Sequence, residues 1–136
     1  MGAWGHLAFD NDTANDWAYD LDDATDLSLV EDALEALDGH EYLDQDVACV
    51  ALAACEVLAR CLGNSGYKNA YTEKVDAWVA ARAMQPSAAL LERASTAIDR
   101  IVGDNSELRD LWAESDELKE WRASVDDLRR RLRERT

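Results

Sequence analysis

Glu56 is the residue whose position most directly suggests acid–base chemistry, because it lies within the apolar segment Ala51–Ala59. Burying a carboxylate is costly unless it is paired, hydrogen-bonded or protonated. In a structural interpretation, a tryptophan indole, an arginine or the backbone of an N-terminal arm donates to Glu56, with Trp4 or an N–H near Gly5 as the expected donor. In a functional interpretation, Glu56 is a general acid in a small pocket. The structural interpretation is favoured.

Four aspartates near the N-terminus have the oxygen ligands that a hard cation prefers. Asp12, Asp16 and Asp20 recur every four residues and so line one face of a helix, and Asp10 lies just before them. A cation site requires several such oxygens within about 2.5 Å of one ion. The spacing Asp-x-Asp-x-x-x-Asp lacks the glycine and the closing glutamate of an EF-hand loop. We therefore expect a solvated or helix-capping face, with no metal ion and no cofactor.

The other residues with reactive side chains form no recognised motif, and no catalytic residue is predicted. The sequence has no glycine-rich phosphate loop, no Cys-x-x-Cys, no His-Glu-x-x-His and no nucleophile elbow, and its two histidines fall in no recognisable pairing. Cys49, Cys55 and Cys61 step by six residues, which turns successive side chains by about 240° on a helix. Because they share no face, buried and reduced thiols in the cytoplasm are expected.

The elements that must position these residues are helices. The chain has 136 residues, 48% of them hydrophobic, with one proline and six glycines. We predict an all-α fold, with one domain over residues 1–136 built as a single compact bundle of five to six helices. The predicted helices run from Asn11–Thr13 to about Asp22, Ser28 to Gly39, Asp44 or Asp46 to Gly63, Thr72 to Met84, Pro86 to Gly103 and Ser106 to the end.

Local patterns assign roles to three of these segments. The third helix is apolar almost all round over Val47–Leu62, which is typical of a central, buried helix. Ser28 followed by Glu31 predicts a capping box at the start of the second helix. Residues 1–10 are predicted to form an ordered arm, because large apolar groups such as Phe9 have no reason to lie exposed.

Residues 104–136 form the predicted C-terminal helical segment, with Ser115 as the candidate position for a break. Apolar residues recur there at coiled-coil spacing, namely Leu111, Leu118, Trp121, Val125, Leu128 and Leu132. Glu114 interrupts this seam, so packing against the rest of the chain is favoured over a homodimer through this helix. Trp121 is expected to be the most exposed of the five tryptophans, since it lies on a late, charged helix.

The net charge of −15 is unevenly distributed. Residues 1–59 contain 15 Asp and Glu and no Lys or Arg, whereas residues 60–136 contain 14 acidic and 14 basic residues. A field of this sign repels nucleic acid and anionic membranes, so neither is an expected partner. It attracts a basic protein, and the alternative is that it serves solubility alone. No basic region followed by an apolar one opens the sequence, so no signal peptide is expected.

The N-terminal block has the pattern Met-Gly-Ala-Trp-Gly-x-x-x-Phe-Asp-Asn-Asp-x-Ala-x-Asp-Trp over residues 1–17. Together with Ala53–Ala59, Asp76–Ala80, Ser106–Glu114 and Glu120–Trp121 with the trailing run Asp126–Leu132, it resembles the bacterial domain-of-unknown-function 4259 family. The resemblance implies a small stand-alone bacterial protein. It also draws attention to Trp4, Gly5, Phe9, Asn11, Asp12, Asp16, Trp17 and Glu56 as a set.

We predict a cytoplasmic, non-enzymatic domain whose acidic N-terminal surface binds a protein partner, as an immunity or inhibitor protein would. The predicted binding residues are Trp4, Asp10, Asn11, Asp12, Asp16, Asp20 and Glu56. One alternative is a small hydrolase or metal-dependent enzyme that uses Glu56 with Asp12 or Asp16. The other is a helical homodimer with a scaffolding role.

Overall fold

The computed structural model describes residues 3 and 5–134 of the chain. Within them lie seven helices, namely α1 (Asp12–Asp22), α2 (Ser28–Glu35), α3 (Gln45–Cys61), α4 (Glu73–Arg82), α5 (Ala88–Val102), α6 (Glu107–Ala113) and α7 (Leu118–Arg133). The all-α prediction is confirmed, but the predicted five to six helices are too few. The difference arises because the C-terminal segment 104–136 forms two helices, α6 and α7.

The break between α6 and α7 lies at Ser115, the position that the sequence indicates. The Ser115 hydroxyl donates to the Trp112 carbonyl at 2.8 Å and accepts from the Glu117 amide at 3.1 Å. A serine side chain that bonds to nearby backbone competes with the hydrogen bonds of a continuing helix. The chain therefore turns after α6, and α7 begins as a separate helix.

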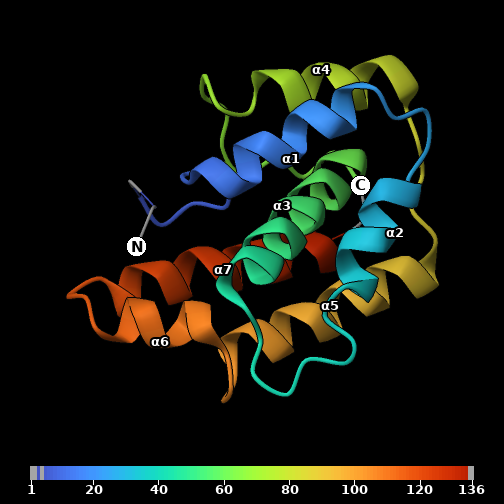
Figure 1. Cartoon of the computed structure of the whole chain (residues 1–136). Helices are drawn as coiled ribbons and strands as arrows, with labels where there is room; N and C mark the ends of the chain where they lie inside the picture. Colours follow the sequence, from blue (N-terminus) through green and yellow to red (C-terminus); the bar gives the residue numbers. More distant parts are fainter. Residues whose placement is uncertain (1–2, 4, 135–136) are drawn as a thin grey trace.

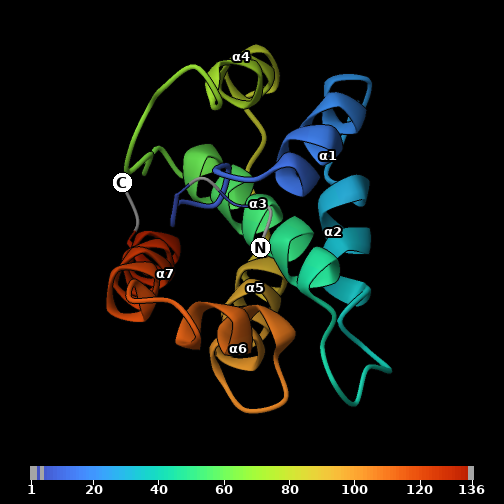
Figure 2. The ribbon, with the colours of Figure 1, turned by 60° about the vertical axis from the view of Figure 1, so that its left-hand side comes forward.

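α3 is the central helix, as its apolar surface predicts. Figure 2 shows α3 in the middle, crossing the view obliquely, with the other labelled helices around it, and α3 contacts each of them. Thirteen of its 17 residues are buried. Five of these are alanines without solvent exposure, whose small side chains let the neighbouring helices approach closely. No described helix, α3 included, combines the length and the apolar character needed to cross a membrane.

Side-chain caps bring the first turns of α1 and α3 together. Asn11 accepts from the Ala14 amide at 2.8 Å at the start of α1, and Asp44 accepts from the Asp46 amide at 2.7 Å at the start of α3. The Thr13 hydroxyl of α1 then donates to the Asp46 carboxylate of α3 at 3.0 Å. The two helix starts therefore form one polar edge beside the N-terminal arm.

The predicted capping box of Ser28 with Glu31 is wrong. The Asp26 carboxylate instead accepts from the Ser28 amide at 3.0 Å and from the Ser28 hydroxyl at 2.6 Å. Asp26 lies two residues before Ser28, so the side chain that stabilises the first turn of α2 comes from the preceding loop.

The apolar seam of α7 packs within the chain. Its buried residues include Trp121, Val125, Leu128 and Leu132, and α7 contacts α3, α5 and α6. The expectation that Trp121 is exposed is wrong, because only 2% of it is accessible. Its ring stacks on that of Trp112 with the centroids 6.2 Å apart. The turn at Ser115 creates this contact by folding α7 back along α6 (Figure 1).

Candidate functional site

Glu56 is held by a buried arginine from the far end of the chain. Arg131 of α7 donates to both carboxylate oxygens of Glu56, at 2.9 and 2.8 Å. Both side chains lie in the interior, with relative exposures of 2% for Glu56 and 4% for Arg131. A two-point contact between a planar guanidinium and a carboxylate fixes orientation as well as distance. The pair therefore locks α7 onto α3.

A second arginine completes this buried charge cluster from within α3. Arg60, one helical turn after Glu56, also donates to its Oε1 atom. Its Nε donates to Asp76 of α4 at 2.8 Å, and its other nitrogen donates to the carbonyl of Tyr67. The carboxylates of Glu56 and Asp76 thus satisfy Arg60, and the cluster joins α3 to α4 as well as to α7.

Asp127 closes the cluster at its solvent side. It accepts from the Arg131 Nε atom at 2.8 Å and from Arg130 at 2.5 Å. Burial raises the pKa of Asp127, but hydrogen bonds from Arg130 and Arg131 outweigh burial and hold that pKa below its ordinary value of 3.8. Burial lowers the pKa of Arg131, yet Glu56 and Asp127 outweigh it and raise that pKa above its ordinary value.

These contacts test the prediction that Glu56 is buried and accepts a hydrogen bond from the N-terminal arm. Its burial is confirmed, and an arginine is one of the donors that the sequence left open. The preferred donor from the arm is wrong for the described residues, since the Gly5 amide makes no hydrogen bond to Glu56 there. Trp4 lies outside the described residues. Guanidinium groups replace the arm because they neutralise the carboxylate, which an amide or indole N–H cannot.

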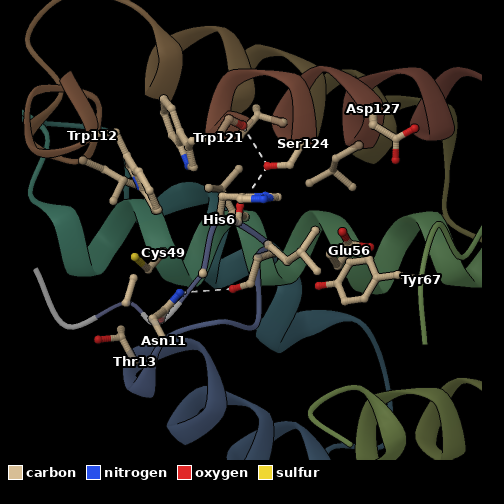
Figure 3. A pocket seen from close by; sticks show the side chains of 18 of the residues that line it. His6, Asn11, Thr13, Cys49, Glu56, Tyr67, Trp112, Trp121, Ser124 and Asp127 are labelled. Carbon is tan, nitrogen blue, oxygen red and sulfur yellow. Dashed lines mark hydrogen bonds between the residues drawn. The ribbon is translucent and has the colours of Figure 1, made fainter. Parts of the chain in front are cut away.

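Next to the cluster lies a cavity of about 330 Å³, bounded by the arm, α3, α6, α7 and the loop before α4. Figure 3 shows Glu56, Tyr67 and Asp127 at one end and Trp112, Cys49 and Thr13 toward the other. Apolar side chains form much of its wall, including Leu7, Leu52, Leu108, Val125 and Leu128. A concave, mostly apolar space with a few polar groups is the usual form of a small-molecule site.

The N-terminal arm covers this cavity and makes hydrogen bonds to α7, to the loop before α4 and to the residue that caps α1. The Ser124 hydroxyl of α7 donates to the His6 carbonyl at 2.8 Å (Figure 3). The Phe9 amide donates to the Tyr67 hydroxyl at 3.4 Å, and the Phe9 ring is fully buried. Asn11 donates from its side-chain amide to the Ala8 carbonyl at 3.2 Å. The described residues of the arm are therefore held against the rest of the chain, in line with the prediction for this segment.

Two side chains on the cavity wall, His6 and Cys49, differ in their capacity for hydrogen bonding and for nucleophilic chemistry. The Nδ1 atom of His6 is buried and has no hydrogen-bond partner among the described residues. The Cys49 thiol has its pKa raised to about 12, mainly by burial and further by the Asp46 and Asp44 carboxylates. A thiol with that pKa is a poor nucleophile near neutral pH. His6 can still accept or donate a hydrogen bond.

The predicted binding residues fall in three places. Asn11, Asp12 and Glu56 line the cavity, Asp16 and Asp20 lie exposed on α1, and Asp10 belongs to the arm, while Trp4 lies outside the described residues. Asp10 is occupied locally, because its carboxylate accepts from the Leu7 amide at 3.2 Å. Within the described residues, no group of three or more His, Cys, Asp or Glu side chains is arranged to hold a metal ion.

Sequence reasoning missed the residues that complete the site. Arg60 lies four residues after Glu56 on one helix face, and that spacing was a usable signal for an ion pair. Arg131 is separated from Glu56 by 75 residues, and only the tertiary fold brings them together. His6 and Trp112 likewise reach the cavity through the placement of the arm and the turn at Ser115.

A comparison with protein families finds one match for the chain. The family model described as "Domain of unknown function (DUF4259)" matches residues 2–124. Apart from Met1, the N-terminal block lies within this match, and so do Ala53–Ala59, Asp76–Ala80, Ser106–Glu114 and Glu120–Trp121, whereas the run Asp126–Leu132 lies after it. No curated protein and no solved structure matches the chain. The match includes the arm and α1 to α6, while Arg131 lies after it.

Proposed function

We propose that this chain, which belongs to the DUF4259 family, is a non-enzymatic binding domain that recognises a basic protein through α1 and α2. The observation that carries the proposal is the difference in ion pairing between the two parts of the chain. Of the 15 acidic residues in residues 1–59, three form ion pairs within the described chain, namely Asp22, Glu35 and Glu56. The others leave their charge available to a partner.

The exposed carboxylates of α1 and α2 that have no ion pair among the described residues form what we call the acidic face: Asp12, Asp16, Asp20, Glu31 and Asp32. In Figure 2, α1 and α2 lie on one side of α3, whereas the arginine-rich α7 lies on the other. Complementary charge steers a basic partner toward the acidic side and increases the association rate.

Tyr19 provides an apolar anchor within the acidic face. It directly precedes Asp20 on α1 with 63% of its surface exposed, and the Lys74 ammonium lies 4.6 Å from the centroid of its ring. Tyrosine is enriched at the centres of protein interfaces, because its ring buries a large area at a small entropic cost. The charge pattern together with this exposed ring supports a protein partner over solubility alone.

The same proposal includes an immunity-like or inhibitor-like role in the cytoplasm. A negatively charged surface that covers a basic site would block a toxin or nucleic-acid-binding protein without chemistry of its own. The three cysteines are buried and unpaired, which suits a reducing compartment.

The experiment that tests this proposal is capture of partners from an extract of the source cells, followed by affinity measurement with the purified partner. The captured protein should be basic, and its affinity should fall steeply between low and physiological salt, because exposed charges are screened beyond about 8–10 Å. Neutralising Asp16→Asn, Asp20→Asn and Glu31→Gln together should weaken binding about tenfold.

A matched control separates recognition by the acidic face from the effect of total charge. Glu92→Gln, Asp116→Asn and Glu120→Gln together remove the same charge from exposed residues of the C-terminal half. This control variant should bind as tightly as the unchanged protein. Equal weakening of both variants, or affinity that does not respond to salt, would overturn the proposed function.

A further inference from the structure

The cavity beneath the arm has polar groups that the fold itself does not use. Its walls are aromatic and aliphatic, with the stacked rings of Trp112 and Trp121 on one side. The His6 Nδ1 atom on the wall is buried without a partner in the described chain. Buried polar atoms are nearly always hydrogen-bonded, so an unpaired one beside a cavity indicates a missing hydrogen-bonding group.

The charged residues around the cavity determine whether a cationic or an anionic ligand would bind there. Glu56 is paired with Arg60 and Arg131, and Asp127 is paired with Arg130 and Arg131. Asp12 and Asp46, at the starts of α1 and α3, also line the cavity and have no ion pair among the described residues. Both side chains are exposed, so they lie at the cavity mouth. An anionic ligand would meet two uncompensated carboxylates there, whereas a cation would be attracted.

We propose that the cavity under the arm binds a small organic amine, with its ammonium group at the Asp12 and Asp46 carboxylates and its apolar body against Trp112. Aromatic faces attract cations and also bury an aromatic ring well. His6 Nδ1 then pairs with a hydroxyl group at the far end of the ligand. This site shares Asp12 with the acidic face, but its other contacts, Asp46, Trp112 and His6, lie outside that face, and the amine does not require the proposed protein partner.

The probes are three molecules of similar shape and different charge, namely 2-phenylethylamine, 2-phenylethanol and phenylacetate. Titration is followed by calorimetry and by tryptophan fluorescence. The amine should bind with a Kd of about 1 mM or tighter, and the alcohol and the carboxylate about tenfold more weakly or worse. Tyramine, which adds a hydroxyl group to the amine, should bind more tightly than 2-phenylethylamine, and His6→Phe should remove that advantage.

Charge variants inside and outside the cavity provide the matched control. Asp12→Asn with Asp46→Asn should weaken amine binding about tenfold while leaving alcohol binding unchanged. Asp16→Asn with Asp20→Asn removes the same charge from α1 outside the cavity and should leave both affinities unchanged. Cys49→Met adds two heavy atoms to the cavity wall and should weaken both ligands, with the thermal unfolding midpoint reporting that the fold is retained.

The proposal is overturned by any of three results. These are the absence of saturable amine binding at millimolar concentration, equal affinity for the amine and the alcohol, or equal weakening by the two pairs of aspartate substitutions. The first would mean that the cavity has no such ligand. The other two would mean that apolar burial or the total charge of the protein explains the binding.

Discussion

Glu56 shows how one carboxylate can stabilise contacts among three helices. Its two oxygens accept from Arg131 of α7 and Arg60 of α3, and Arg60 continues the cluster to Asp76 of α4. Removing one member of a buried ion cluster leaves opposite charges without compensation in a low-dielectric interior. Replacing the whole cluster by apolar groups would leave no uncompensated charge and would avoid this loss of stability.

The first prediction concerns substitution of this carboxylate. Glu56→Gln should lower the free energy of unfolding by about 3–5 kcal/mol, because both buried guanidinium groups lose one of their two carboxylate partners. Urea denaturation followed by circular dichroism measures the change. Glu31→Gln, the same substitution on the exposed side of α2, is the control and should fall within about 0.5 kcal/mol of the unchanged protein. If the two variants are equally stable, the ion cluster does not stabilise the fold.

The second prediction concerns the pH dependence that Asp127 confers. Its pKa in the folded chain is below the ordinary 3.8, so folding favours the ionised form. The stabilising contribution is present above the unfolded value and is lost as the pH falls through the folded value. Thermal unfolding midpoints between pH 7 and pH 2 should therefore drop less for Asp127→Asn than for the unchanged protein. Asp116→Asn should keep the original pH profile, and a profile of Asp127→Asn that matches it would contradict the assignment.

At the scale of the helices, the sequence contained most of the information needed to predict where each helix begins. Apolar spacing and the N-cap residues Asn11, Asp44 and Ser106 locate the starts of α1, α3 and α6 within a residue or two. These signals are local, since a cap and its amide lie within three residues of each other. The contact of Glu56 with Arg131 and the cavity under the arm were not predictable in this way. They depend on how α7 folds back, which no short window of sequence encodes.

The third prediction tests the central position of α3. Leu52 lies in the middle of α3 with an exposure of 4%, so Leu52→Ala should cost about 2–5 kcal/mol through lost burial and the space left behind. A thermal or urea melt measures it. Leu29→Ala on the partly exposed side of α2 is the comparison and should cost less. A Leu52→Ala variant that melts like a surface variant would exclude α3 as the core.

At the scale of the whole molecule, the excess of negative charge opposes folding. The acidic side around α1 and α2 has few compensating bases, whereas the C-terminal half balances its own charges. Like charges brought together by folding repel each other, and dissolved salt screens that repulsion. The ion cluster around Glu56 is buried and is screened much less.

The fourth prediction follows from that contrast. The thermal unfolding midpoint should rise between low salt and about 0.15 M salt, where the screening length falls to about 8 Å. Neutralising Asp16, Asp20 and Glu31 together should raise the midpoint at low salt and reduce the further gain. The matched variant at Glu92, Asp116 and Glu120 should show a smaller effect. A midpoint that falls with added salt would mean that surface attraction outweighs repulsion.

The 75-residue separation of Glu56 and Arg131 also has a consequence for how the protein is made. A ribosome adding about 5–20 residues per second needs about 4–15 s to reach Arg131 after it has passed Glu56. During that interval Arg131 has not been synthesised, and Arg60, one helical turn after Glu56, is the arginine that can already pair with the carboxylate. The nascent chain should therefore stay open to proteases until α7 has left the exit tunnel. Chains stalled before and after α7 has left the tunnel should therefore differ sharply in their resistance to proteases.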